Sequence, residues 1–345
     1  MANSVRMVAL VSILAVLPTQ TPAQTAIDLA QYYKGKTIRV IVGYSPGGGY
    51  DAYSRLLSEH LHRFIPGGPS IVVQYMPGAA TELATAYILN AAPQDGTVIG
   101  IPVSSLPMSN TLFPRPGQKN IDVSKMRWIG RLDAIDTVAI VAARTGVSKV
   151  EDTKKIPVVF GATAKTSATY IVPLILNRLG KGNFKIVLGY RGTTGAYLAM
   201  ERREIDGMHN GVWSQLKRTR KEWIRDKSIN VIYQHALQRS TELPDVPTIV
   251  ELGQSDEDRR MFSLFASEST LGRTFYVSDG IPRKLVSVLR QAFSKMVVDA
   301  VFLAAAKKLD MPINPLSGEE LDKVVADIVS APPQLIKRIR KLTAE

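Results

Sequence analysis

Two glycine-rich segments carry the residue types and spacing that could hold a ligand in this 345-residue chain. They are residues 45–49 (SPGGG) and residues 76–80 (MPGAA). Glycine lets the backbone approach a ligand and turn its amides toward it. A helix that follows such a loop adds unpaired N–H groups and a partial positive charge, which together bind an anion without a charged side chain. The pair therefore predicts a site for a small anion such as a carboxylate, and the alternative is two tight turns without a ligand.

The strength of such a site follows from its hydrogen bonds. A hydrogen bond to a charged group contributes about 1.5–3 kcal/mol, so several amides together give roughly micromolar affinity. Asp51 stands in the first turn of the expected helix, where a negative charge is favourable. A role for Asp51 in orienting the loop is the second interpretation.

Strand and helix patterns alternate around both loops. β-branched and apolar runs predict strands over residues 37–43, 71–73 and 97–101. Apolar residues at helical spacing between 53 and 64 predict one helix, and a second is expected over 81–90. Because parallel strands of an open α/β sheet bind ligands outside their carboxyl ends, both glycine-rich loops are expected at one binding edge.

A second block of strands begins near residue 138. Strands are expected over residues 138–142, 156–160, 184–188, 205–208 and 229–233. The helix expected after the loop 161–167 contains Pro173, which disfavours a continuous helix. Helices then dominate, over residues 282–298, 301–309, 318–330 and 334–342.

The two blocks predict an α/β protein of two lobes. The first lobe is expected to contain residues 27–130 and 240–345, and the second lobe residues 131–239. The chain is expected to cross between them near residues 128–136 and again near 234–243.

The N-terminal segment has the order of charge, apolar run and small residues that is typical of a secretory signal. Arg6 precedes the apolar residues 7–17, which are too few to span a bilayer. The prediction is a signal peptide of residues 1–23, cleaved after Ala23, with Ala26 as the alternative. A buried N-terminal helix is the competing interpretation.

Catalytic and cofactor chemistry finds little support in the sequence. The chain has no cysteine, and the first loop lacks the dinucleotide fingerprint and the phosphate-loop motif. The histidines lack metal-ligand spacing, and they are His60, His62, His209 and His235. We therefore expect no catalytic residues, no metal and no cofactor, while an enzyme acting on a carboxylate in the same cleft stays open as the alternative.

The formal net charge of +13 suits an anionic ligand. Basic runs at 217–221 and 337–341 also raise the alternative of a surface adaptor for nucleic acid or lipid. Solvated helix faces explain both runs more simply, and an exported protein is not expected to meet nucleic acid.

Most of the mature sequence resembles the solute-binding receptors of tripartite tricarboxylate transporters, also called the Bug or tricarboxylate-receptor family. The resemblance rests on residues 44–51 (YSPGGGYD), 76–81 (MPGAAT), 93–97 (PQDGT), 190–192 (YRG) and 243–253 (LPDVPTIVELG). It implies a periplasmic binding protein-like (type II) clamshell of two α/β lobes with a cleft between them. It also implies a periplasmic, monomeric receptor that delivers a small mono- or dicarboxylate to a membrane permease.

The resemblance further implies which residues bind the ligand. In the first lobe they are Tyr44, Ser45, Gly47, Gly48, Ala79 and Ala80, and in the second lobe Thr163, Ser167 and Asp206. Ala80 and Thr81 stand where the family often has two glycines, so a methyl group there is expected to narrow the site or redirect an amide. Lys165 and Arg273 are open candidates for a carboxylate contact, with an ordinary surface position as the alternative for each.

Overall fold

The first lobe is built on a mixed sheet in the computed structural model, which describes residues 28–114, 121–165, 167–190 and 192–344, apart from the side chain of Ala80. The strand order within these residues is β11-β4-β10-β3-β1-β2. The strands are β1 Thr37–Val42, β2 Ser70–Tyr75, β3 Val98–Ile101, β4 Met126–Arg131, β10 Thr274–Ser278 and β11 Leu316–Ser317. Strands β1, β2 and β3 are parallel, with Val42 beside both Tyr75 and Ile101, so their carboxyl ends share one edge.

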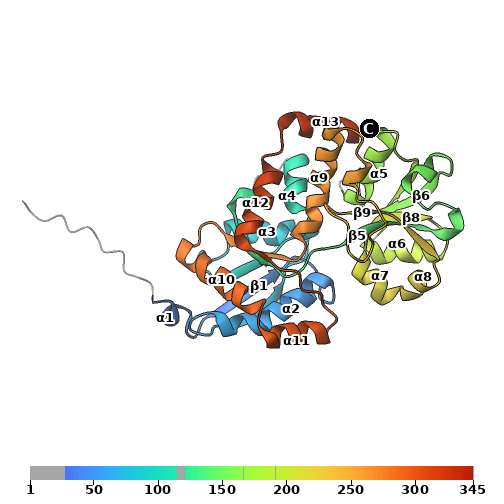
Figure 1. The fold of residues 1–345 in the computed structure, drawn as a ribbon. Helices are drawn as coiled ribbons and strands as arrows, with labels where there is room; N and C mark the ends of the chain where they lie inside the picture. The colour runs from blue at the N-terminus through green and yellow to red at the C-terminus, as the bar shows by residue number, and fades with distance from the viewer. Residues whose placement is uncertain (1–27, 115–120, 166, 191, 345) are drawn as a thin grey trace, which may run out of the picture.

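Helices cover both faces of this sheet (Figure 1). Helix α2, Gly49–Leu61, follows β1 and buries Tyr53, Leu56, Leu57 and Leu61, the apolar face that the sequence pattern predicts. Helix α3, Glu82–Asn90, follows β2 through the short 3-10 turn η2, Ala79–Thr81. The predicted β-α-β-α-β order is therefore confirmed. The remaining helices of this region are α1 Leu29–Tyr33, α4 Leu106–Leu112, α10 Arg283–Met296, α11 Ala300–Lys308 and α12 Gly318–Val329.

The second lobe has its own sheet, in the order β7-β6-β8-β5-β9 within the described residues. Its strands are β5 Thr137–Ala142, β6 Val158–Ala162, β7 Phe184–Leu188, β8 Gly207–Val212 and β9 Ile229–His235. Strand β6 is parallel to both β7 and β8. The helices around this sheet are α5 Ala168–Arg178, α6 Gly192–Glu201, α7 Trp213–Thr219 and α8 Lys221–Arg225. Two α/β lobes are therefore present, as the sequence predicts.

Helix α5 continues through Pro173 despite the interior proline. Proline removes one backbone hydrogen bond and disfavours an interior helical position by about 3 kcal/mol. The helix nevertheless buries Ile171, Val172, Ile175 and Leu176. Burial of large apolar side chains contributes roughly 1.5–3 kcal/mol each, which offsets the proline.

The chain crosses between the lobes twice, and the two crossings touch. The first crossing runs from β4 to β5, and the second leads from β9 through α9, Asp256–Leu271, to β10. The N–H of Leu132 donates to the carbonyl of Arg273 at 3.0 Å, and the N–H of Arg273 donates to the carbonyl of Asp133 at 2.8 Å. This pair of hydrogen bonds joins the two connecting segments into one hinge.

Two later helices lie between the lobes in Figure 1. Helix α9 packs against both β9 and α12, and helix α13, Pro333–Thr343, packs against α5 as well as α4. One buried apolar cluster accordingly includes residues of both lobes, such as Ile88 and Phe160. The assignment of all residues from 240 to 345 to the first lobe stays a prediction.

Sequence patterns gave an incomplete account of these elements. The four C-terminal helices lie close to their predicted ranges, whereas α4, β4, α9 and β10 were not predicted. Short 3-10 turns complete the description at η1 His62–Phe64, η4 Val123–Lys125, η5 Ala143–Thr145, η6 Val150–Lys154 and η7 Val250–Leu252.

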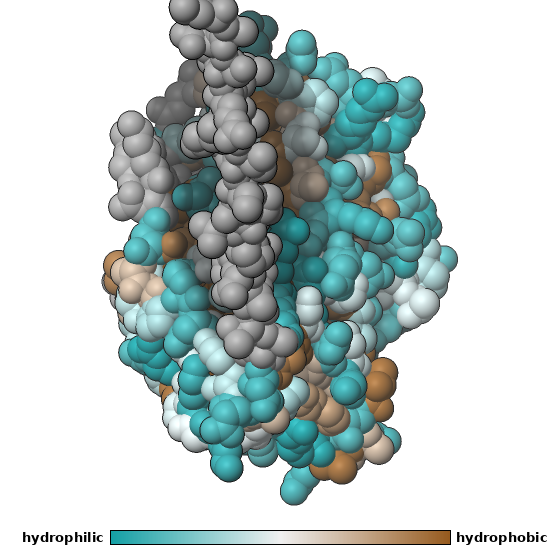
Figure 2. Space-filling view, turned by 90° about the vertical axis from the view of Figure 1, so that its left-hand side faces the viewer, coloured by the Kyte–Doolittle hydropathy of each residue, from teal (hydrophilic) through white to brown (hydrophobic). Residues whose placement is uncertain are grey.

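The outer face of the first lobe is largely hydrophilic, with hydrophobic side chains in scattered patches (Figure 2). Among the described residues, no helix has the length and apolar character needed to cross a membrane. The predicted signal peptide, residues 1–23, and its alternative cleavage position at Ala26 lie outside the described residues.

Candidate ligand-binding site

The two glycine-rich loops lie in contact at the carboxyl edge of the first sheet. A Cβ atom on Gly43, which follows β1, would lie 2.6 Å from the Cβ of Thr81 in the second loop. Such an approach is possible only for glycine. The hydroxyl of Thr81 accepts a hydrogen bond from the N–H of Val103 at 3.1 Å, which attaches the loop after β3 as well. Three consecutive strand-to-helix loops therefore meet at one place.

Asp51 fixes the conformation of the first loop. Its carboxylate accepts hydrogen bonds from the Gly47 N–H at 2.8 Å, the Tyr75 hydroxyl at 2.7 Å and the Arg55 Nε at 2.8 Å. Burial acts to raise the pKa of Asp51, but these hydrogen bonds together hold it below its ordinary value. The role in orienting the loop, the second interpretation of this residue, is therefore the one the geometry supports. The Gly47 amide is engaged within the protein.

Helix α2 begins directly after this loop, with Gly48 as its N-cap and no side-chain cap from the described residues. Ser45, Gly47 and Gly48 are exposed. The first-turn N–H groups of a helix have no partner within the helix, so they carry the partial positive charge of the helix dipole. This end of α2 can therefore bind an anion.

Arg273 adds a full positive charge at the same end of α2. Its guanidinium lies 4.2 Å from the ring centroid of Tyr50, and its Nη2 would lie 2.8 Å from a Cβ on Gly49. Tyr50 in turn stacks on Tyr44, with ring centroids 5.0 Å apart. The structure thus places Arg273, which the sequence left open, against the first loop rather than at a remote surface.

The second loop keeps a glycine-like backbone although it lacks the glycines. Ala79 has φ +45° and Thr81 has φ +77°, both in the left-handed region. This conformation costs a residue with a Cβ roughly 1–2 kcal/mol. Ala79 is exposed, and Ala80 follows it in the turn η2. Thr81, one of the two positions where glycine was expected, therefore introduces backbone strain into this loop.

A cavity of about 210 Å³ lies between the lobes. On the first-lobe side it is lined by the loop after β3 and by α4, through Val103, Ser105, Met108, Ser109 and Phe113. The second-lobe side includes Thr163, Ser167, Thr169, Tyr190, Met208 and Asn210, and α9 contributes Glu268. Tyr44, Ser45, Gly47, Gly48, Ala79 and Ala80 are not among its lining residues. Between the two, the N–H of Ser104, which stands between the lining residues Val103 and Ser105, donates to the Tyr50 hydroxyl at 3.2 Å.

Three hydroxyl groups gather where α5 begins. The Thr163 hydroxyl donates to the Ser167 hydroxyl at 2.9 Å and lies 3.1 Å from the Thr169 hydroxyl. Thr169 also accepts a hydrogen bond from the Thr163 N–H at 3.0 Å. The predicted residues Thr163 and Ser167 are thus brought to the cavity together with Thr169. Lys165 is exposed on the same loop outside the lining set, and Thr166 and Arg191 lie outside the described residues.

The structure does not bring Asp206 to this cavity. Its carboxylate pairs with Arg144 at 2.9 Å and accepts the Val159 N–H at 2.9 Å, beside the amino end of β6. The sequence placed a strand over 205–208 and read its end as the binding edge. Because β8 instead runs from Gly207 to Val212, the residue that reaches the carboxyl edge is Asn210.

Glu268 is the lining residue that the sequence analysis missed most clearly. It is 8% exposed, and burial raises the pKa of its carboxyl to about 7, against the opposing effect of a hydrogen bond with Ser104. An acidic residue on the face of α9 that also carries Met261 and Phe265 was the available signal, because helical spacing puts all three on one side. Ser105, Ser109 and Asn210 carried no comparable signal.

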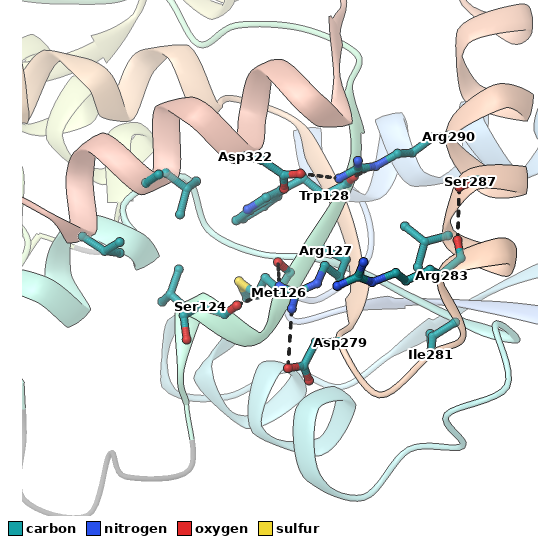
Figure 3. A pocket seen from close by; sticks show the side chains of 15 residues that line it. Ser124, Met126, Arg127, Trp128, Asp279, Ile281, Arg283, Ser287, Arg290 and Asp322 are labelled. Carbon is teal, nitrogen blue, oxygen red and sulfur yellow. Dashed lines mark hydrogen bonds and ion pairs between the residues drawn. The ribbon is translucent and has the colours of Figure 1, made fainter.

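The larger cavity in Figure 3, of about 630 Å³, lies at the opposite edge of the first sheet, where β4 begins. Two of its arginines already pair with acids. Arg290 contacts Asp322 at 2.6 Å, and Arg127 lies 3.7 Å from Asp279. Paired charges leave this cavity a weaker candidate for an anion than the interlobe cavity.

Metal and catalytic groupings are not apparent in the part of the chain that the structure describes. No cluster of three or more histidine or acidic side chains there could hold a metal. His209 is fully buried, and its ring lies against Tyr233, with Nδ1 at 2.8 Å from the tyrosine hydroxyl. His209 and His235 thus belong to the core of the second lobe.

Comparison with known proteins identifies the architecture. The TctC solute-binding protein from Polaromonas, solved without ligand, has a TM-score of 0.66 and 18% identity, covering 89% of this chain and 99% of that one. Rpa4515 from Rhodopseudomonas palustris, solved with adipate, has a TM-score of 0.63 and 15% identity over 89% and 97%. MatC from the same organism, solved with malate, has a TM-score of 0.60 and 18% identity over 90% and 99%. The predicted two-lobe fold of periplasmic binding proteins is confirmed.

The family follows from the sequence profile. The model of the tripartite tricarboxylate transporter family receptor, TctC, matches residues 53–340, which is most of the chain. This match confirms the resemblance drawn from the loop motifs and places the chain among receptors rather than enzymes. The chain belongs to the TctC family of solute-binding receptors of tripartite tricarboxylate transporters.

Proposed function

We propose that this receptor captures a small carboxylate between its lobes and delivers it to a tripartite membrane transporter. The observation that carries the proposal is the position of the Arg273 guanidinium against Tyr50 and Gly49, at the N-terminus of α2. Family membership supports it, as do the similar receptors solved with adipate and malate.

In this proposal the first lobe binds one carboxylate end. Amides of the first turn of α2 and of the loops at Tyr44–Gly48 and Ala79–Ala80 donate hydrogen bonds, and Arg273 supplies the charge. Gly47 acts through the shape of the loop, because its own amide already donates to Asp51. A charge-assisted hydrogen bond is roughly twice as strong as a neutral one, which favours an anion over an alcohol or amide.

The second lobe closes on the bound ligand. Thr163, Ser167 and Thr169 present hydroxyls that can reorient toward either a donor or an acceptor. Asn210 takes the place first given to Asp206. Closure about the hinge at Leu132 and Arg273 adds these contacts after the first lobe has bound.

Export and docking complete the proposal. Residues 1–23 form the signal peptide in this scheme, and the mature receptor, a monomer, acts in the periplasm. The closed form docks to the membrane subunits of the transporter that gives the family its name.

The test is a thermal shift and calorimetric titration of the mature protein with mono-, di- and aminocarboxylates. Ligand binding stabilises the folded protein by mass action, by about 2.7 kcal/mol when the free ligand is at a hundred times its Kd. The melting temperature rises accordingly. Arg273→Gln is expected to weaken the best acid at least about tenfold, since it removes a charge-assisted contact. Arg283→Gln, an exposed arginine in the cavity of Figure 3, serves as the control. No response to any acid would refute the proposal.

A further inference from the structure

Glu268 places a buried acidic group in the wall of the interlobe cavity. It projects from α9 and is 8% exposed. Its Oε2 atom has no hydrogen-bond partner among the described residues. A buried carboxyl oxygen without a partner loses the hydrogen bonds it had in water, so a ligand donor that reaches this atom from the cavity would gain an acceptor already stripped of water.

The charges around the cavity are arranged in two opposite groups. Tyr44 lies within electrostatic range of both Arg273 and Glu268, since the pKa of its hydroxyl, raised mainly by burial and by Tyr50, is lowered by the arginine and raised by the glutamate. Arg273 lies at the N-terminus of α2, whereas Glu268 lines the cavity beside Ser104. A ligand that spans the site meets a positive end and an acidic end.

We propose that Glu268 determines specificity by binding a cationic amino group, so that the ligand is an amino-bearing carboxylate rather than a dicarboxylate. This inference rests on the proposed function, in which the carboxylate end lies at Arg273 and α2. A second ligand carboxylate near Glu268 would be opposed by like charge, whereas an ammonium group pairs with it. Two of the similar receptors were solved with dicarboxylates, malate and adipate, and the proposal gives this chain a different class of ligand.

The remaining lining residues suit the middle of such a ligand. Met108, Phe113 and Met208 are apolar, and Phe113 and Tyr190 offer aromatic rings. Methylene groups pack on apolar side chains, and ring faces attract cations. The hydroxyls of Thr163 and Ser167 complete the wall with groups that accept from an ammonium as readily as they donate.

The experiment measures dissociation constants by calorimetry for a panel of matched ligands. The panel contains straight-chain ω-amino carboxylates, monocarboxylates and dicarboxylates of three to six carbons, together with α-amino acids. For the wild type, an amino carboxylate is expected to bind at least about tenfold more tightly than the monocarboxylate and dicarboxylate of equal length. Glu268→Gln is expected to reduce this preference at least about tenfold, and Glu268→Asp to retain part of it.

A control variant and a second readout separate selectivity from folding. Glu257→Gln changes an exposed glutamate on the same helix, paired with Arg338 at 3.3 Å, and should leave the preference intact. Binding of an ammonium stabilises the ionised form of Glu268, so near pH 7 the wild type releases a proton, seen in buffers of different ionisation enthalpy. Glu268→Gln should release none.

The outcomes distinguish the two proposals. Equal or tighter binding of dicarboxylates by the wild type, or an unchanged preference in Glu268→Gln, overturns the assignment of Glu268 and leaves a carboxylate receptor standing. Absence of binding by every acid in the panel overturns both. A melting curve shows whether Glu268→Gln is folded. If it is not, the ligand preference of Glu268→Asp is compared with that of the wild type instead.

Discussion

The amide of Gly47 donates to the carboxylate of Asp51 across 2.8 Å, and this hydrogen bond fixes the loop that precedes helix α2. Replacement of Asp51 by alanine leaves the Gly47 amide and the Tyr75 hydroxyl without their acceptor. We expect unfolding free energy to fall by about 1–3 kcal/mol, and carboxylate affinity to fall with it. Urea denaturation and calorimetry measure the two effects. Asp256→Ala, at an exposed residue paired with Arg259, is the control, and an equal loss in both variants would contradict this account.

The contact between Gly43 and Thr81 predicts a steric effect. Gly43→Ala puts a Cβ 2.6 Å from the Thr81 Cβ and 2.7 Å from its Cα, so backbone must move. Overpacking of this kind costs about 1–3 kcal/mol, measurable by urea denaturation. Gly48→Ala is the matched control, because it meets no atom within 4 Å and its φ is −89°. Equal stability of the two variants would mean that the loops do not touch.

The strained Ala79 predicts a stabilising substitution. Its φ of +45° lies in the region that glycine adopts without penalty, so Ala79→Gly is expected to raise the unfolding free energy by about 0.5–1 kcal/mol. Ala304→Gly on the exposed face of α11 should have the opposite sign, at roughly 0.5–1 kcal/mol of destabilisation. Thermal denaturation of both variants under one condition decides the matter, and a loss of stability in Ala79→Gly contradicts the backbone assignment.

Replacement of Glu268 is expected to change the pH dependence of stability. The pKa of the folded-state carboxyl is raised from 4.5 to about 7 by burial. The folded state therefore binds the proton more tightly, and stability present below pH 4.5 is lost as the pH rises through 7, by roughly 3 kcal/mol. Glu268→Gln has no such loss. Without ligand, its unfolding free energy relative to that of the wild type should therefore increase between pH 5 and pH 9. The same difference in unfolding free energy between variant and wild type at pH 5 and at pH 9 would rule this out.

The buried histidines predict sensitivity to acid. Burial lowers the pKa of His235 from 6.5 to about 4, and that of His209 well below 6.5. The unfolded state binds protons first, so stability present above pH 6.5 falls as the pH drops toward 4, by roughly 3 kcal/mol for His235, and His209 acts in the same direction. His235→Gln should lose less stability than the wild type between pH 7 and pH 4.5. Imidazole NMR signals that titrate near pH 6.5 in the folded protein would contradict this prediction.

Local sequence patterns predicted the regular strands and helices of the first βαβαβ unit. The alternation from residue 37 to 101 predicts β1, α2, β2, α3 and β3, because strand and helix periods differ and glycines separate them. Helix α9 was missed although its apolar face is regular, since charged residues at its start broke the pattern. The strand expected over residues 205–208 is β8, Gly207–Val212, and the residue of this region that lines the interlobe cavity is Asn210 rather than Asp206.

The candidate site was predictable only where one segment supplies it. The loop at Tyr44–Gly48 and the hydroxyls of Thr163 and Ser167 are local features with recognisable composition. The positions of Arg273 and Glu268 depend on how α9 and the hinge pack against α2 and the cavity. Spacing along the chain contains no information on such contacts, because they join residues that are far apart in sequence, such as Arg273 and Tyr50.

Arg273 has its backbone in the hinge and its side chain at the ligand end of α2. Its N–H and carbonyl pair with Asp133 and Leu132, while its guanidinium lies over Tyr50. A rotation of one lobe about this hinge would therefore displace the same residue that is proposed to contact the anion. Under the proposed function, ligand occupancy and lobe closure would therefore be coupled through this one residue, and a transporter could distinguish a loaded receptor by its shape.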